Sequence, residues 1–381
     1  MDMSLRHLPE LEALVDRHED AKDPFVMTEV MDINLVNSQN FLGVNSISGF
    51  SSSFSMTNMA MLDRYNIHTS SNIIGYISGN PIADMFLRVK YFIVDTGTSA
   101  FSSPYPVVDR EYKYELHLNS HALCLGTFID KNEALTEYDA ALYDSSVYSY
   151  SGTEKKYETA FDMQNAFAKC FEDEDLYKKV DLLDKSSEIK ITEADNYYEI
   201  FPDESDKAYM IAQVHVNDTL KGHLYIAVNN GINYVGLCNN KEDDLYIRLP
   251  KVNTKNISFG ILNEDVYENL YERFSKYQMY DITTTSSGIQ GKIDAPSEGT
   301  VFISLPHLYG FSVTIDGKEA SIKDFMGGMG IDVTPGSHTL TLSYKRANMK
   351  PGYIITGLTI LMLIIFNYIK SKKTKKSVEN E

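Results

Sequence analysis

The sequence predicts an α+β protein: a mixed α/β N-terminal region, then an antiparallel β-sandwich, then one C-terminal transmembrane helix. Three observations support this fold class. Helical and strand-like patterns alternate in the first half of the chain. Strand-like segments recur about every 10–14 residues in the second half, separated by turn residues. The chain ends in one long apolar run that is followed by lysines.

Helices and strands alternate up to about residue 185. Residues 4–18 place leucines at helical spacing, and Pro9 fits a first helical turn. Asn80-Pro81 is a capping residue followed by a proline at the first helical position, which favours a helix there. The predicted order is helix 4–18, strand 25–33, helix 57–65, helix 81–88, strand 89–95, a strand and turn within 111–128, and helix 162–176.

The second half has the pattern of an antiparallel sandwich, since VFISL and TLTLSYK alternate apolar and polar residues. Asp316-Gly317 is a strong signal for a hairpin turn. The helix predicted to interrupt the strands is 265–277. The predicted strands are 197–201, 210–216, 223–228, 233–237, 245–249, 257–261, 289–293, 301–305 and 338–344. We therefore expect a mixed region over 1–185 and a β-sandwich-like domain over 186–347.

The last apolar run, Tyr353–Ile369, reads YIITGLTILMLIIFNYI and carries no charge. It is near the lower length limit for crossing a hydrocarbon core of roughly 30 Å. Lys370, Lys372, Lys373, Lys375 and Lys376 follow at once, and such a cluster stays on the cytoplasmic side. We therefore predict a transmembrane helix over 353–369, a basic cytoplasmic tail over 370–381, and an extracellular location for everything before the helix.

The N-terminus lacks the pattern of an export signal. Residues 1–23 read MDMSLRHLPELEALVDRHEDAKD, without a basic start, an apolar stretch or a small-residue cleavage site. The expectation is therefore that membrane segments lie upstream, in the same protein or in a separate chain that associates with this one.

Charge and cysteine content exclude several classes of protein. The net charge is −18, although the tail after residue 349 is basic, and this acidity disfavours a nucleic-acid partner. The three cysteines (Cys124, Cys170 and Cys238) are odd in number and widely spaced, so they form neither a disulfide framework nor a zinc pattern. We expect them to be buried as small apolar side chains.

The best binding candidate is the polar loop Asn40–Ser55, because amide and hydroxyl side chains suit sugar or phosphate groups. Simple loop packing is the alternative. The acidic run Asp173–Asp175 has the form of a metal–nucleotide-sugar motif but is better explained as a solvated helix surface. His117 and His121 could bind a metal on a helix, but their segment has the pattern of a strand or loop. The sequence indicates no catalytic residue, metal site or cofactor.

Several ordered blocks resemble the YfhO-type family of bacterial membrane proteins. They span residues from about 25 to 365, and no single block is diagnostic alone. In two of them the chain departs from the family pattern: Leu116 replaces an asparagine, and Phe311 stands where tryptophan is common. The blocks are NFLGVNSISGFSSSFS, IIGYISGNPIADMFLRVKYFIVD, YELHLNSHALCLGTFID, FDMQNAF, VFISLPHLYGFSVTIDGKEA and PGSHTLTLSYKRANMKPGYIITGLTI.

The resemblance implies a membrane glycosyltransferase-like protein. Members of the family look like enzymes that transfer a sugar from a polyprenyl-phosphate carrier to lipoteichoic acid or another surface glycopolymer of the cell envelope. The chain departs from them because it lacks the many-helix membrane bundle that carries their acidic catalytic residue, so no catalytic residue is carried over. The matched motif positions, carried over as binding candidates, are Asn40, Asn45, Ser51, Ser52, Gln164 and Asn165.

Two hypotheses of different class follow. In the first, the chain is the extracellular part of such a glycosyltransferase and is inactive alone. Its partners would be the lipid bilayer, an upstream membrane-bundle chain, the polyprenyl-phosphate sugar and the glycopolymer acceptor. In the alternative, it is a non-catalytic, membrane-anchored protein that binds surface glycans through its β-rich half.

Overall fold

The N-terminal half is built on a mixed four-stranded sheet with the strand order β1-β5-β7-β6. β1 (Met27–Met31) is parallel to β5 (Val89–Asp95), whereas β7 (Tyr114–Leu118) and β6 (Val107–Glu111) add in antiparallel fashion. β5 has the bounds that its pattern predicts. The computed structural model describes residues 7–31, 37–51, 56–65, 67–69, 73–76, 80–96, 103–133, 160–180, 188–191, 196–200, 210–216, 219–226, 232–237, 245–248, 258–286, 288–345 and 349–378.

Short helices cover this sheet. α1 (Leu8–Asp16) buries its leucines against β1, β5 and β7 in one apolar cluster, as its spacing predicts. α4 (Pro81–Phe86) starts at the predicted cap, where the Asn80 side chain accepts a hydrogen bond from the Ala83 N–H at 3.2 Å. The other small elements here are the 3₁₀ helix η2 (Glu19–Lys22), α2 (Gln39–Leu42), α3 (Met56–Arg64) and the strands β2 (Gly49–Phe50), β3 (His68–Thr69) and β4 (Ile73–Gly75).

The main core lies where α4, α6 (Ala160–Ala168) and α7 (Glu264–Ser275) meet. Phe86 of α4 packs edge-to-face on Phe167, Phe274 and Phe302, with ring centroids 5.6, 4.9 and 5.7 Å away. These aromatic contacts join elements far apart in the chain. α6 ends at Ala168, so the predicted helix end near residue 176 is wrong, because the chain turns there and buries Leu176 and Tyr177 in the core.

The region after α6 is rich in strands, as the turn spacing predicts. Two four-stranded antiparallel sheets have the orders β10-β15-β12-β13 and β14-β11-β16-β9. Their strands are β9 (Tyr177–Val180), β10 (Glu188–Ile191), β11 (Asn196–Ile200), β12 (Met210–Val216), β13 (Thr219–Ile226), β14 (Ile232–Leu237), β15 (Leu245–Arg248) and β16 (Ser258–Leu262).

Two further antiparallel sheets share one apolar core and form a sandwich. The first has the order β17-β18-β24-β20-β21, and the second has the order β22-β23-β19-β8. Asp316 and Gly317 have φ angles of 52° and 78°, so the predicted hairpin turn between β20 and β21 is confirmed. The strands are β8 (Gly126–Asp130), β17 (Tyr280–Thr285), β18 (Gly288–Ala295), β19 (Gly299–Ile303), β20 (Phe311–Ile315), β21 (Lys318–Ala320), β22 (Lys323–Phe325), β23 (Gly328–Val333) and β24 (Gly336–Tyr344).

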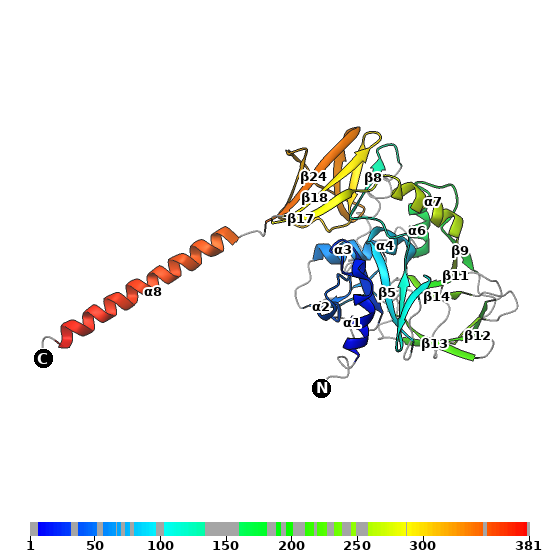
Figure 1. Ribbon diagram of the computed structural model, residues 1–381, viewed down its shortest axis with the longest axis horizontal. Helices are drawn as coiled ribbons and strands as arrows, with labels where there is room; N and C mark the ends of the chain where they lie inside the picture. The colour runs from blue at the N-terminus through cyan, green and yellow to red at the C-terminus, as the bar shows by residue number, and fades with distance from the viewer. Residues whose placement is uncertain are drawn as a thin grey trace, which may run out of the picture.

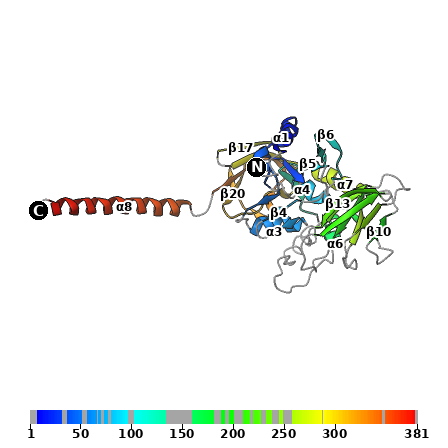
Figure 2. The ribbon, with the colours of Figure 1, turned by 90° about the horizontal axis from the view of Figure 1, so that it is seen from below.

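The C-terminal helix α8 (Met349–Val378) projects away from the rest of the molecule in both views (Figure 1, Figure 2). Its segment Pro351–Lys370 has a mean hydropathy of 1.9, so it is long and apolar enough to cross a membrane. None of this segment is buried against the rest of the protein. It contains the predicted span 353–369. The predicted α+β fold, with antiparallel sheets and one apolar C-terminal helix, is confirmed.

The predicted division at residue 185 stays a prediction. β8 precedes that residue in the chain and pairs with β19 along its whole length, and β9 likewise pairs with β16. Figure 1 shows the sheet that contains β17, β18 and β24 next to α3 and α4, with β12 and β13 at the far side of the molecule.

Candidate binding pocket

The polar loop singled out in the sequence folds over one buried carboxylate, that of Glu29 on β1. Glu29 accepts hydrogen bonds from the Ser46 hydroxyl at 2.9 Å, the Ser48 hydroxyl at 2.7 Å and the Ser48 N–H at 3.3 Å. The Ile47 N–H donates to its other oxygen. Burial, opposed by these bonds, raises the pKa of Glu29 to about 7. Glu29 therefore fixes the path of residues 46–48.

Two side-chain amides close the loop from its N-terminal side. The Phe50 N–H donates to the Asn37 side-chain oxygen at 2.9 Å, and the Asn37 amide nitrogen donates back to the Phe50 carbonyl at 3.4 Å. The Gln39 amide donates to the Ser48 carbonyl at 2.8 Å. These bonds satisfy backbone groups of Ser48 and Phe50, so the loop has a defined shape.

The loop forms one wall of a pocket of about 340 Å³, which we call the Arg88 pocket. The other walls come from α3, from the junction of α4 and β5, and from residues 304–306 after β19. Its apolar lining includes Met61, Leu62 and Leu305. Its polar lining consists of Asn37, Gln39, Ser46, Ser48, Ser51, Asn58, Arg88 and Ser304. An apolar pocket body with a few polar groups is typical of small-molecule sites.

Arg88 is the charged residue of this pocket. Its side chain is 3% exposed, and it donates to the Phe25 carbonyl at 2.9 Å and to the Ser304 carbonyl at 3.4 Å. Burial lowers the pKa of Arg88 to about 10, so the guanidinium is still charged at neutral pH. Its Nε has no hydrogen-bond partner within the described residues.

Two neutral groups of the pocket are also without a partner in the described part of the chain. They are the hydroxyl of Ser304, which is 5% exposed, and the side-chain oxygen of Asn58. Buried polar groups are nearly always hydrogen-bonded in folded proteins. Three such atoms around one pocket therefore point to a ligand with both anionic or acceptor groups and hydroxyl donors.

The predicted loop positions lie at different distances from this pocket. Ser51 lines it. Asn40 is exposed on α2, and Asn45 is exposed with its amide donating to the Asp23 carbonyl at 3.3 Å. Ser52 lies outside the described residues.

The other predicted pair, Gln164 and Asn165, is buried on α6, away from the lining of the Arg88 pocket. The Gln164 amide donates to the Asn80 side-chain oxygen at 2.8 Å, and so joins α6 to the cap of α4. The Asn165 amide donates to the Tyr177 carbonyl at 2.9 Å, and its oxygen accepts from the Tyr177 N–H at 2.7 Å. Both contacts hold the core together.

Sequence reasoning missed Glu29, Arg88 and a second buried carboxylate, Asp84 on α4. Tyr105 donates to Asp84 at 2.5 Å, while burial raises the pKa of Asp84 well above its ordinary value. Asp84 is fully buried. The signal available was a charged residue within a mostly apolar stretch: Glu29 in FVMTEVM, and Asp84 and Arg88 in PIADMFLRVKYF.

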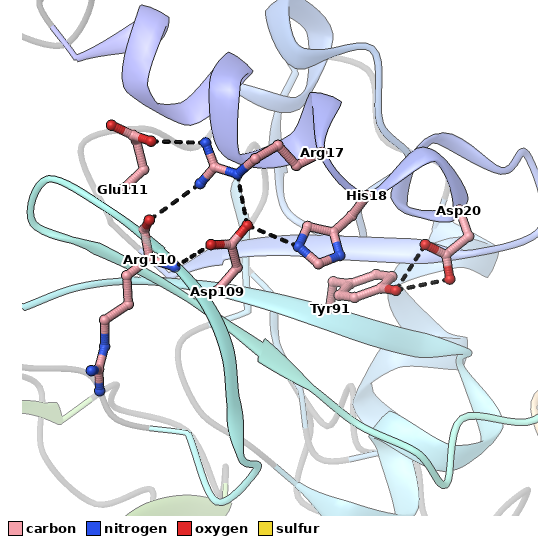
Figure 3. Close-up of polar contacts among 7 residues, drawn as sticks. All are labelled: Arg17, His18, Asp20, Tyr91, Asp109, Arg110 and Glu111. Atoms are coloured by element: carbon pink, nitrogen blue, oxygen red, sulfur yellow. Dashed lines mark hydrogen bonds and ion pairs between the residues drawn. The ribbon is translucent and has the colours of Figure 1, made fainter.

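A cluster of charges on the surface ties α1 and η2 to the mixed sheet (Figure 3). Arg17 pairs with Asp109 and with Glu111 at 2.8 Å each, and His18 lies 3.0 Å from Asp109. Hydrogen bonds from Arg17 hold the pKa of Asp109 well below its usual range. Tyr91 donates to Asp20 at 2.8 Å. All these groups have partners within the cluster, which indicates a structural role.

The acidic run and the cysteines of the sequence form no ligand site among the described residues. Asp173, Glu174 and Asp175 are exposed in the turn after α6, where Lys169 pairs with Asp175 at 2.8 Å. The described residues include no group of three or more His, Cys, Asp or Glu that could hold a metal. Cys124 is exposed, so its predicted burial is wrong, because its neighbours Leu123 and Leu125 are the ones buried in the core; Cys238 lies outside the described residues.

Comparison with solved structures gives a weak likeness. A GH2 β-galacturonidase from Eisenbergiella tayi, bound to galacturonate, matches with 13% identity and a TM-score of 0.15. The match covers 42% of this chain and 29% of the enzyme, so the chain spans less than a third of that protein's length. Such a low score supports no argument about fold or function. No curated protein matches the chain.

Comparison with protein families gives a clear result. The family model described as bacterial membrane protein YfhO matches residues 3–356, a range that ends within the first turns of α8. A membrane location agrees with the one helix in the described residues that is able to span a bilayer. The chain therefore belongs to the YfhO family of bacterial membrane proteins.

Proposed function

We propose that this chain is the extracellular, glycan-binding part of a membrane glycosyltransferase-like protein. In this proposal the protein transfers a sugar from a polyprenyl-phosphate carrier to lipoteichoic acid or another surface glycopolymer. Regions 1–185 and 186–347 lie outside the cell, residues 353–369 of α8 span the membrane, and residues 370–381 lie in the cytoplasm. The Arg88 pocket holds part of the glycan.

One observation carries the proposal. The loop that resembles a family motif is held by the buried Glu29 as the wall of a pocket that contains unpartnered polar atoms. Sugars present many hydroxyl groups, which both donate and accept hydrogen bonds. Ser304 and Asn58 offer groups of the complementary kind, and the apolar lining can cover the faces of a sugar ring.

The test uses the full chain in phosphatidylcholine nanodiscs and lipoteichoic acid as the probe, with binding measured by surface plasmon resonance. The variant Ser51→Tyr places a large ring at the pocket wall, so affinity should fall at least tenfold, which is about 1.4 kcal/mol. Ser312→Tyr is the matched control, because Ser312 is exposed on β20 and outside the pocket. Equal binding by both variants would remove the pocket from the proposal.

A transfer assay separates the two classes of function. The chain is mixed with a radiolabelled polyprenyl-phosphate sugar and the polymer, with and without the family's membrane bundle. Transfer that requires both proteins supports a glycosyltransferase. Binding that persists without transfer in either mixture supports the alternative, a non-catalytic glycan-binding protein anchored in the membrane.

A further inference from the structure

We infer that the Arg88 pocket is a phosphate-binding site, which takes the phosphate group of a glycan or of a lipid carrier close to the membrane. This inference rests on the proposed function, since it names the charged part of the ligand at the same site.

Arg88 differs from the arginines that pair with carboxylates. Arg17, Arg64, Arg110 and Arg273 each form an ion pair with a carboxylate at 2.7–3.0 Å. Arg88 is far more buried and forms no ion pair among the described residues; its side chain donates to two carbonyl oxygens, and Asp23 attracts it at longer range. A buried charge without a counter-charge in direct contact is unfavourable. An anion in the pocket would provide that counter-charge.

The backbone at Arg88 supports the same conclusion. Its φ angle is 64°, the left-handed conformation that commonly follows a helix end and that glycine adopts without strain. A side chain with a Cβ costs about 1–2 kcal/mol in this conformation. The chain bears this strain at a residue that lines the pocket.

The pocket suits a tetrahedral anion attached to a polar group. Arg88 follows α4, Ser304 follows β19, and Asn58 lies on α3, so the unpartnered atoms come from three different elements. Phosphate oxygens point in several directions and can accept from the guanidinium Nε and from the Ser304 hydroxyl together. The Asn58 oxygen can then accept from a hydroxyl of the attached group. A volume of about 340 Å³ leaves room for both.

The wall of the pocket is also connected to the membrane helix. Residues 304–306 are followed, after two residues, by Tyr309, which is 88% exposed, and by Gly310. The Gly310 carbonyl accepts from the Lys345 N–H at 2.9 Å, and α8 begins at Met349. Exposed tyrosines favour the membrane–water interface. This connection allows the phosphate to belong to a membrane lipid. A soluble molecule with the same phosphate group is the other possible source.

The experiment measures phosphate binding to the full chain in phosphatidylcholine nanodiscs. Inorganic phosphate and glycerol 3-phosphate, titrated by calorimetry, represent the soluble source. Nanodiscs that contain a polyprenyl monophosphate, monitored by ³¹P NMR line width, represent the lipid source. Glucuronate serves as a carboxylate probe of similar charge.

The decisive variant is Asn58→Asp, which keeps the side-chain size and adds a negative charge to the lining of the Arg88 pocket. We expect at least tenfold weaker phosphate binding. Gln290→Glu adds the same charge on an exposed position of β18, and we expect its affinity to stay within twofold of the unaltered chain. Arg88→Lys keeps the charge but removes Nε, so its binding should weaken as well, and circular dichroism reports whether it folds.

The outcomes separate this inference from the proposed function. Binding of either phosphate source, weakened by Asn58→Asp, supports the site and identifies the source. No phosphate binding, equal binding by Asn58→Asp, or glucuronate binding as tight as phosphate would each overturn it. If lipoteichoic acid still binds in a manner sensitive to Ser51→Tyr, the proposed function survives that result. If phosphate binds and the polymer does not, only the proposed function fails.

Discussion

At the scale of single residues, Glu29 makes the loop of the Arg88 pocket sensitive to pH. Its pKa in the folded protein, about 7, lies above the ordinary value of 4.5 because the carboxyl is buried. The folded state therefore keeps a proton that the unfolded chain releases. This stabilisation is complete below pH 4.5 and declines as the pH rises to about 7, by a total of about 3 kcal/mol.

The predicted effect is a loss of loop protection between pH 4.5 and 7, measured by hydrogen exchange of peptides covering residues 37–51 and corrected for intrinsic rates. Glu29→Gln should flatten this pH dependence and, because its amide cannot accept from the Ile47 N–H and the Ser48 groups together, lower stability by about 1–3 kcal/mol at pH 5. Glu12→Gln, an exposed position on α1, is the control. An unchanged slope in Glu29→Gln would assign the effect to another group, such as Asp84.

The residues of the pocket were hard to predict for a physical reason. Glu29 sits in a strand pattern where a charged residue normally faces water, and only the distant residues 46–48 reveal that it is buried. Arg88 ends a helical pattern, where a cation is expected on general grounds because it favours the helix dipole. Its burial depends on Phe25 and Ser304, which are far away in the chain.

At the scale of secondary-structure elements, Asn165 joins α6 to β9. Its amide bonds both backbone groups of Tyr177, and all of these groups are buried. In Asn165→Asp, a carboxylate oxygen replaces the amide nitrogen that donates to the Tyr177 carbonyl. This oxygen has no proton to donate, so the hydrogen bond is lost and two acceptors face each other. We expect a loss of about 1–3 kcal/mol in the free energy of unfolding, measured by urea denaturation.

Asn40→Asp is the matched control, because Asn40 is exposed on α2 and should change stability by less than about 0.5 kcal/mol. Binding of lipoteichoic acid below the denaturation range distinguishes a structural Asn165 from a ligand-contacting one. A stable Asn165→Asp variant that has lost binding would support the prediction that Asn165 is a binding residue.

Elements with a strong local signal were predictable from the sequence. The strand Val89–Asp95, the cap at Asn80 and the hairpin at Asp316-Gly317 depend on neighbouring residues alone. Strand partners depend on distant residues. The pairing of β8 with β19 joins residues more than 160 positions apart, and no local pattern encodes it. The end of α6 was missed because the burial of Leu176 and Tyr177 outweighs the helix propensity of the preceding residues.

At the scale of the whole molecule, the pocket can bind surface glycans only if the residues before α8 lie outside the cell. The lysine cluster after α8 argues for that orientation, because moving each lysine into the hydrocarbon costs on the order of 2.5–3.5 kcal/mol even on insertion scales. The acidic remainder of the chain opposes this weakly, since Asp and Glu contribute little to orientation.

We therefore predict that Gln290, exposed on β18, is outside the cell and that Ser377, near the end of α8, is inside. The test introduces a cysteine at each position in a chain whose Cys124, Cys170 and Cys238 are replaced by serine. Intact cells are treated with a membrane-impermeant thiol reagent, and permeabilised cells report total reactivity. Gln290→Cys should be labelled in intact cells and Ser377→Cys only after permeabilisation. The reverse pattern would place the Arg88 pocket in the cytoplasm, and transfer to a surface polymer could not then occur at this pocket.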